Sequence, residues 1–253
     1  MLERINSPEI IRATFKTNPF VNDWLFSDCF YRREKTEIFG EVKDGILSSY
    51  ILIYYGLEEP VVIVYNYLPE MLSYINVVRG KRTVITVFGD YEEIFKEISK
   101  TERALLRDNL LLYAKKVNFY PGARRLTLED KKAYEDFKSK VSWFKNSNFS
   151  TNIYGSFEGE KLVSVATKIG ENDYCKIGGV YTLKEYRGKG HAKKVVSLIS
   201  KECIENNLTP FLIVYSKNEP AIRVYKAVGF EELLHFKWIK LNGFTTFDEE
   251  TLS

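Results

Sequence analysis

The stretch GGVYTLKEYRGKGHAKKVVSLIS, from Gly178 to Ser200, joins an extended segment, a glycine-rich corner and a patterned segment in close succession. After the corner, apolar residues recur at the spacing of one helical face, at Ala192, Val195, Val196, Ile199 and Cys203. This spacing predicts a helix that begins near Gly190. The first turn of a helix presents unpaired N–H groups and the positive end of the helix dipole. The corner is therefore suited to hold a phosphate group.

The residues of the corner support this interpretation. Gly188 and Gly190 would let a ligand approach the main chain, while Arg187, Lys189 and Lys193 would add positive charge. Two common phosphate motifs do not fit, because a Walker loop needs Ser or Thr at Gly190 and a dinucleotide fingerprint needs glycine at Lys193. The plain alternative is a tight turn whose basic side chains are only solvated.

A second strand and helix follow closely in TPFLIVYSKNEPAIRVYKAVGF, residues 209–230. Asn218 is a plausible N-cap, Pro220 suits the first helical turn, and Gly229 suits a left-handed helix end. The apolar spacing of this helix places Tyr225 on its inward face. An inward tyrosine taken alone is most often a core residue whose hydroxyl has a partner.

Turn and cap signals predict several other elements. Lys43, Asp44 and Gly45 supply the turn of a hairpin in residues 40–56, and residues 158–160 supply the turn of a second hairpin in residues 152–169. Thr127 and Asp130 form an approximate capping box ahead of a helix. We place a domain boundary at the Pro-Gly turn near residue 121.

These motifs together carry a resemblance to a known family. Residues from about 126 to 240 resemble a GCN5-related N-acetyltransferase (GNAT) domain, and the corner together with NEPAIRVYKAVGF is similar to the FR47-like branch of that superfamily. Arg187, Gly190 and Ala192 match the superfamily pattern of Gln or Arg, two residues, Gly, one residue, and Gly or Ala. The resemblance implies an α/β fold whose central mixed, mostly antiparallel sheet is flanked by helices and splayed where acyl-coenzyme A (CoA) inserts. Residues 1–120 resemble a degenerate GNAT-like domain, and residues 121–253 would bind acetyl-CoA.

The resemblance also implies roles for particular residues. The backbone of Val180 and Tyr181 would align the pantetheine arm and polarise the thioester. Asn218 would contact CoA, and Tyr225 would protonate the departing thiolate, as a phenol in a water-poor cleft can do. The pyrophosphate would be held by the corner, that is, by Arg187, Gly188, Lys189, Gly190, His191 and Ala192.

The residues on the acceptor side are less defined. Where some members of the superfamily carry Glu, this chain has Lys176 and its neighbours, so the general base is unassigned; Asp173 and Glu171 are the nearest carboxylates. Cys175 is interpreted as a packed strand cysteine, because no histidine lies nearby in the sequence. An acceptor pocket would draw on aromatic residues that are more often core, namely Trp143, Phe144 and Phe149.

Composition limits the partners. A formal charge of +3 is too small to indicate a nucleic-acid binder, and the apolar runs are too short for a membrane span. The cysteines, Cys29, Cys175 and Cys203, are odd in number and far apart, so we expect no disulfide framework and a reducing cytoplasm. His191 and His235 are too few and too separated to predict a metal site.

The resemblance thus implies an enzyme that transfers an acetyl group directly from acetyl-CoA, its co-substrate, to a primary amine of a small molecule or a protein. The alternative is a non-catalytic CoA-binding sensor or interaction module. A weaker third hypothesis, nucleic-acid binding through the basic corner, conflicts with cofactor binding by the same residues. The oligomeric state and the acyl-chain preference are not readable from the sequence.

Overall fold

The computed structural model describes residues 2–23, 25, 32–141, 148–170 and 175–243. These residues form two compact units. The N-terminal unit contains the described residues up to 109 and those of 235–243, and the C-terminal unit contains those of 110–234. Two strands, β6 (Ala104–Tyr113) and β12 (Glu231–Leu241), contribute residues to both units. The domain boundary predicted near residue 121 stays a prediction.

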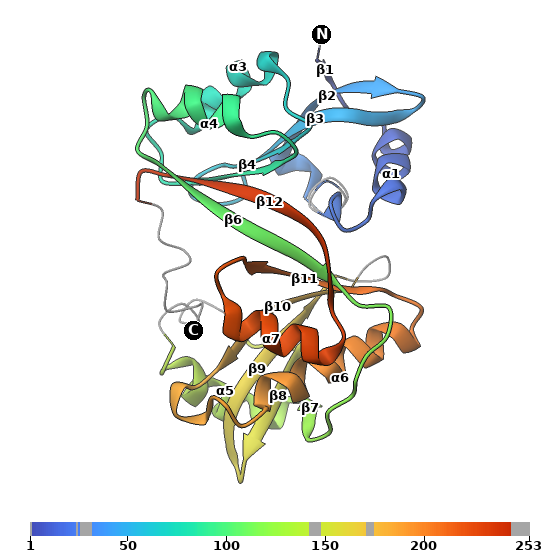
Figure 1. The fold of residues 1–253 in the computed structure, drawn as a ribbon, viewed down its shortest axis with the longest axis vertical. Coiled ribbons are helices and arrows are strands. Elements are labelled where there is room, and N and C mark those ends of the chain that lie inside the picture. The colour runs from blue at the N-terminus through green and yellow to red at the C-terminus, as the bar shows by residue number, and fades with distance from the viewer. Residues whose placement is uncertain (1, 24, 26–31, 142–147, 171–174, 244–253) are drawn as a thin grey trace. The chain divides into compact units, whose positions relative to one another are not determined.

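The N-terminal unit is a sheet covered by helices on both faces (Figure 1). Its strand order is β1 (Glu3–Arg4), β2 (Thr36–Lys43), β3 (Ile46–Tyr54), β4 (Val61–Tyr65), β5 (Val84–Phe88) and then β12. The pair β4–β5 is parallel, whereas β1–β2, β2–β3, β3–β4 and β5–β12 are antiparallel. Helix α1 (Pro8–Thr17) covers one face, and α3 (Leu72–Ile75) and α4 (Glu92–Ser99) cover the other. Short 3-10 turns lie at Arg33–Lys35, Pro69–Met71 and Asn76–Val78.

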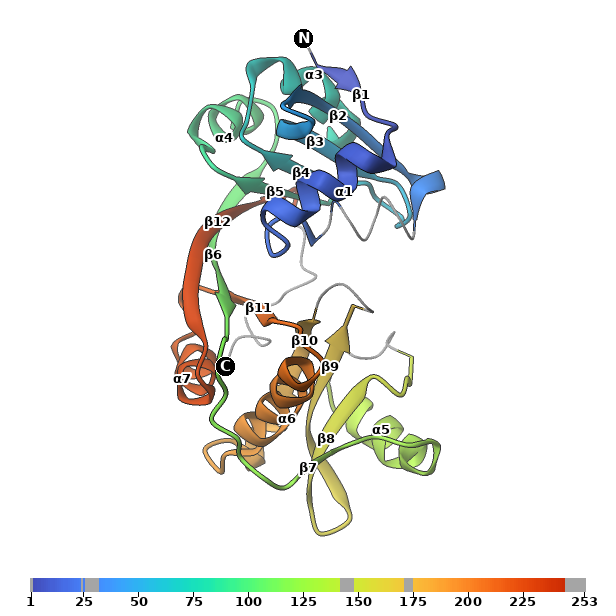
Figure 2. The same ribbon diagram turned by 90° about the vertical axis from the view of Figure 1, so that its right-hand side faces the viewer.

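The C-terminal unit is built in a similar way (Figure 2). From β6 its strand order continues with β11 (Pro210–Tyr215), β10 (Cys175–Thr182), β9 (Lys161–Ile169), β8 (Ile153–Glu158) and β7 (Ala123–Arg125). The pair β10–β11 is parallel, and β7–β8, β8–β9 and β9–β10 are antiparallel. Helix α5 (Lys131–Lys138) covers one face, while α6 (His191–Glu205) and α7 (Glu219–Val228) cover the other. Neighbouring residues of β8 point to opposite faces, so Ile153 packs under α5 and Tyr154 under α6.

The predicted mixed sheet with flanking helices is confirmed, and so are the two predicted hairpin turns and the predicted capping box. In the first hairpin, Asp44 and Gly45 both have positive φ, and Lys43 pairs with Ile46. The second hairpin turns at residues 159–160. Asp130 closes the predicted capping box on a 3-10 turn, Leu128–Asp130, that leads into α5. A further 3-10 turn, Lys184–Tyr186, leads from β10 to the corner.

The two units differ at their parallel strand pairs. In the N-terminal unit, β4 pairs with β5 from Val62 to Tyr65, almost its whole length. In the C-terminal unit, β10 pairs with β11 only over Cys175–Ile177, although β10 continues to Thr182. The register of β10 against β9 also shifts between Gly178 and Tyr181, where Gly179 has φ +58°. This bulge redirects the free part of β10 at the point where it leaves β11.

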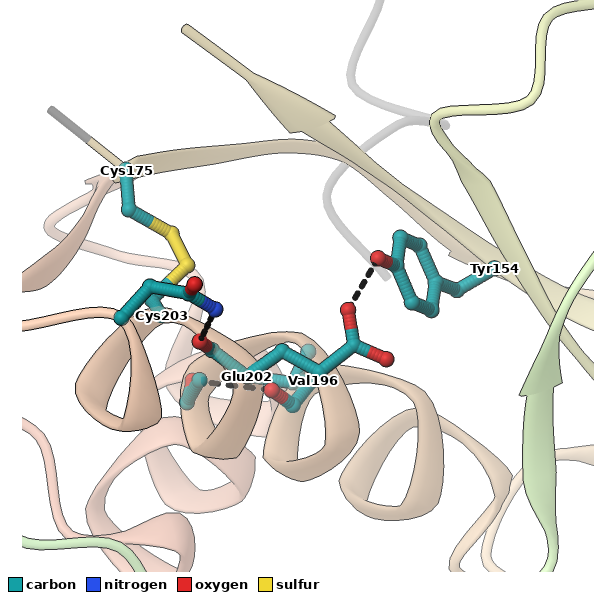
Figure 3. Close-up of a disulfide and its surroundings, with 7 residues drawn as sticks. Tyr154, Cys175, Val196, Glu202 and Cys203 are labelled. Carbon is teal, nitrogen blue, oxygen red and sulfur yellow. Dashed lines mark hydrogen bonds between the residues drawn. A yellow bond between two sulfur atoms is a disulfide. The ribbon is translucent and has the colours of Figure 1, made fainter. Parts of the chain in front are cut away.

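The structure corrects the prediction for the cysteines. Cys175, the first residue of β10, forms a disulfide with Cys203 in the last turns of α6, and their Cα atoms are 6.1 Å apart (Figure 3). Both side chains are buried, so the expected packing is present together with a covalent bond. Sequence reasoning missed the pair because α6 brings together two residues that are 28 positions apart. Cys29 lies outside the described residues. The disulfide means that the cysteines no longer support the predicted cytoplasmic location. The location stays a prediction.

Candidate functional site

A cavity of about 370 Å³ opens where β10 leaves β11. Its walls are the end of β10, the glycine corner, the start of α6 and one face of α7. Of the ten site residues predicted from the sequence, Lys189 is exposed and does not line this cavity. The others lie together around it: Val180, Tyr181, Arg187, Gly188, Gly190, His191, Ala192, Asn218 and Tyr225. Their binding and catalytic roles stay predictions.

The strand wall presents main-chain groups to the cavity. Val180 and Tyr181 follow the bulge, in the part of β10 that has no register partner on β11. An unpaired strand edge offers N–H and C=O groups to an extended ligand. The pantetheine arm of CoA carries amides that can accept and donate such hydrogen bonds.

The corner forms an open turn of main chain. Gly188 and Gly190 have φ values of +78° and +84°, which L side chains rarely adopt. A Cβ atom added at Gly188 would meet nothing within 4 Å, and one at Gly190 would meet only the Cε of Lys193, at 3.9 Å. Helix α6 begins directly afterwards with Gly190 as its N-cap, which confirms the predicted helix start. The space above this turn is therefore open to a phosphate group.

The charged residues that line the cavity within the described part of the chain are all basic, namely Arg187, Lys193 and Arg223. Arg187 donates from Nε to the carbonyl oxygen of Thr182 at 3.1 Å, and its guanidinium lies 5.4 Å from the ring centroid of Tyr181. Its side chain thus braces the end of β10 as well as adding charge. The ammonium of Lys193 lies 5.0 Å from the ring centroid of Tyr120.

Helix α7 supplies the opposite wall. Asn218 accepts a hydrogen bond from the N–H of Ala221 at 3.2 Å, and Gly229 ends the helix with φ +112°, so both predicted caps are confirmed. Tyr225 faces inward and is only 7% exposed. Its ring packs edge-on against Phe230. Burial raises the pKa of the Tyr225 hydroxyl above its ordinary value, so this group holds its proton at neutral pH.

His191, the first residue of α6, has a buried side chain with two partners on β8. Its Nδ1 lies 2.9 Å from Oγ of Ser156, and its Nε2 lies 3.0 Å from Oε1 of Glu158. Burial lowers the pKa of His191, and the nearby Lys194 lowers it further, while Glu158 opposes both effects. Sequence reasoning missed Ser156 and Glu158, because only the folding of α6 against β8 brings them to the histidine.

Other lining residues were also missed, among them Thr182, Tyr186, Pro220, Ala221, Arg223 and Val224. Of those on α7, Ala221 carried a usable signal. Ala221 lies four residues before Tyr225 and so shares its helical face. Arg223 had no such signal, and its position at the cavity follows from the way α7 packs.

The acceptor side is only partly described. Asp173, Glu171, Trp143 and Phe144 lie outside the described residues. Phe149 packs against the core beneath α5, with its ring 5.7 Å from that of Tyr134, as expected for a core aromatic. The ammonium of Lys176 lies 6.0 Å from the ring centroid of Phe211. The general base is therefore still unassigned.

Among the described residues, no cluster of three or more His, Cys, Asp and Glu side chains is arranged to hold a metal ion. In the same part of the chain, no helix combines the length and the apolar character needed to cross a bilayer.

Comparison with known proteins gives a family match and a shared fold. Residues 153–239 match the family model described as FR47-like protein. A Drosophila protein solved by X-ray crystallography has a TM-score of 0.67 at 14% identity, over 96% of this chain and 99% of that chain. A GNAT-family acetyltransferase from Colwellia psychrerythraea has a TM-score of 0.53 at 14% identity, over 95% and 99%. A tandem GNAT protein from the clavulanic acid biosynthesis pathway has a TM-score of 0.52 at 13% identity, over 95% and 98%. No curated protein matches the sequence at a significant level.

At these low identities the solved structures show the fold alone. That fold is the GNAT fold, and the tandem relative agrees with a second, GNAT-like half in the N-terminal part of the chain. Residues 153–239 are thus similar to the FR47-like family, and the chain shares its fold with solved GNAT structures. The predicted fold class is thereby confirmed.

Proposed function

We propose that this protein, with its FR47-like segment and its GNAT fold, transfers an acetyl group from acetyl-CoA to a primary amine of a small molecule or a protein. One observation carries the proposal: a single cavity joins an unpaired strand edge, an open glycine turn at a helix N-terminus and a buried tyrosine. These three features correspond to the three parts of the donor that need recognition, namely pantetheine, pyrophosphate and thioester.

The main chain would supply most of the binding. The edge of β10 at Val180 and Tyr181 binds the pantetheine amides, and an N–H there polarises the thioester oxygen. The N–H groups from Gly188 to Ala192 hold the pyrophosphate, supported by the basic wall of the cavity. Asn218 contacts the donor while it caps α7.

Tyr225 would act as the general acid. The amine nitrogen attacks the thioester carbonyl carbon, the carbon–sulfur bond breaks, and the Tyr225 hydroxyl gives its proton to the departing sulfur. Burial raises the pKa of the phenol, but the same low-dielectric surroundings also raise the pKa of the thiol that forms. The acceptor must arrive as a neutral amine, so its own proton goes to a base that is still to be found.

A non-catalytic CoA-binding protein is the second candidate. It is favoured by one observation, that within the described part of the chain no carboxylate lines the cavity. The buried hydroxyl of Tyr225 favours the enzyme. Release of free CoA thiol during incubation with acetyl-CoA and a library of amines distinguishes the two candidates, since a sensor binds the donor without turnover.

Calorimetric titration of acetyl-CoA into the wild type and a Gly190→Glu variant tests the shared basis of both candidates. Gly45→Glu is a matched control, because Gly45 also has positive φ and open space around its Cβ position, but lies in the hairpin turn of the N-terminal unit. We expect saturable binding to the wild type and to Gly45→Glu. Binding to Gly190→Glu should be lost, because the new carboxylate stands where the pyrophosphate would lie.

Each outcome has a defined meaning. If the folded wild type does not bind acetyl-CoA, the proposal is wrong and the corner is only a turn. Equal losses in both glutamate variants, with both proteins folded by circular dichroism, would mean that backbone strain rather than the corner controls binding.

A further inference from the structure

The side chain of His191 connects the end of the glycine corner to strand β8. Its backbone opens α6 at the cavity, while its imidazole is fully buried between Ser156 and Glu158 of β8. Both ring nitrogens therefore face partners on one strand. The hydrogen bond at Nδ1 and the close contact at Nε2 connect the start of α6 to this strand.

The number of hydrogens on the imidazole decides which hydrogen bonds can form. Ser156 has one hydroxyl proton and two acceptors within reach, Nδ1 of His191 at 2.9 Å and the carbonyl oxygen of Gly122 at 3.3 Å. In the neutral ring the proton belongs on Nε2, which faces the carboxylate of Glu158, so Nδ1 accepts from Ser156 and the carbonyl of Gly122 does not. In the charged ring Nδ1 donates to Ser156, whose own proton is then free for Gly122.

Charges of both signs face the imidazole. Glu158 on β8 favours the charged ring, and its contact with Nε2 is close but not aligned as a hydrogen bond. Lys194 on α6 and Lys189 in the corner oppose it. Tyr186, from the turn before the corner, contributes only the edge of an aromatic ring, 6.4 Å between centroids. An anion bound at the corner would offset the two lysines and shift this balance toward the charged ring.

We propose that His191 is the positioning residue of the corner, and that it takes up a proton when the pyrophosphate of acetyl-CoA binds. Uptake would release the Ser156 hydroxyl to Gly122 and so tighten the segment that runs beside α6. That segment is already held to the helix, because Ser197 bonds the N–H of Tyr120 at 3.0 Å. The inference rests on the proposed function, because it needs a diphosphate at the corner.

The test is a measurement of protons exchanged on binding. Acetyl-CoA is titrated into the wild type, His191→Asn and His235→Asn in two buffers of different ionisation enthalpy, from pH 5.5 to pH 7.5. The chain has only two histidines, and His235 is exposed and paired with Asp108, so its variant is the matched control. Protons exchanged by the phosphates of CoA are common to all three proteins and cancel in the comparison.

We expect the wild type and His235→Asn to take up more protons than His191→Asn. Because the ring is more often charged in the complex than in the free protein, affinity should fall as pH rises. The fall should be at least about threefold larger in the wild type than in His191→Asn, which corresponds to a pKa rise of about half a unit. Glu158→Gln changes a half-exposed side chain and should move proton uptake to lower pH, whether or not His191→Asn folds.

The outcomes separate this inference from the proposed function. If the wild type binds acetyl-CoA with the same proton uptake as His191→Asn, or if Glu158→Gln leaves the uptake profile unchanged, His191 is a fixed neutral anchor and the inference is wrong. If the wild type does not bind acetyl-CoA at all, the proposed function is wrong as well.

Discussion

Tyr225 is the residue on which the chemical step depends. Tyr225 belongs to the core cluster beneath α6 and α7 and also lines the cavity. Tyr225→Phe removes the hydroxyl and keeps the ring, so we expect little change in stability and less than about threefold change in the Kd for acetyl-CoA. Loss of a general acid should lower kcat by about 100-fold or more. Stopped-flow or steady-state release of CoA thiol measures this change.

The control for Tyr225 is another buried tyrosine of the same cluster. Tyr154 bonds through its hydroxyl to Glu202 and does not line the cavity (Figure 3). Tyr154→Phe should cost about 1 kcal/mol of stability and leave kcat within a few-fold. Similar kcat values for the wild type and Tyr225→Phe would remove Tyr225 from the mechanism, and a loss of acetyl-CoA binding would make its hydroxyl structural.

The stability of helix α5 depends on the 3-10 turn Leu128–Asp130 that precedes it. The carboxylate of Asp130 accepts from Arg124 at 2.5 and 2.6 Å and from the N–H of Thr127 at 2.8 Å. The hydrogen bonds from Arg124, more than any other contact, lower the pKa of Asp130 to about 2. Asp130→Asn should therefore lower the free energy of unfolding at pH 7 by about 1–2 kcal/mol, as measured by urea denaturation.

The same carboxylate predicts a pH dependence. Its folded-state pKa is below the ordinary value of 3.8, so its contribution is present above that value and is lost as pH falls toward 2. The stability difference between the wild type and Asp130→Asn should thus shrink from pH 5 to pH 3. Asp136, an exposed residue of the same helix, is the control, and Asp136→Asn should stay within about 0.5 kcal/mol at each pH. A constant difference for Asp130→Asn would contradict the assigned pKa.

Elements with local signals could be predicted from the sequence, and contacts between distant residues could not. The caps at Gly190, Asn218 and Gly229 and the hairpin turns follow from backbone preferences of a few adjacent residues. The residues from Val180 to Ala192 lie together at the cavity because β10, the corner and α6 are consecutive, and α7 adds Asn218 and Tyr225. In contrast, the disulfide to Cys203 and the two partners of His191 arise only when α6 lies along β8 and β10. No local sequence pattern predicts the disulfide or the contacts of His191.

At the scale of the whole molecule, the two units share a fold plan but not the features of the site. After β4, the N-terminal unit has Pro69 and the four-residue helix α3, where the C-terminal unit has glycines and the long helix α6. Its parallel strands β4 and β5 are paired along almost the whole length of β4, so no strand edge is left free there. The cavity beside α3 and α4 measures only about 80 Å³. In this described segment after β4, an anion would find no comparable helix N-terminus, since a helix as short as α3 has a weak dipole.

This difference predicts that each chain binds one acetyl-CoA. Native mass spectrometry at saturating acetyl-CoA should show the wild-type chain with one bound molecule, and Gly190→Glu with none. Desulfo-CoA, which keeps the pyrophosphate but has no thiol to acylate, is a useful second probe, because it should fill the same single site without turnover. Two molecules bound per chain, with one retained in Gly190→Glu, would mean that the N-terminal unit also holds the donor. The closed β4–β5 pair would then have to open in solution, which hydrogen exchange at Val62 to Tyr65 would detect.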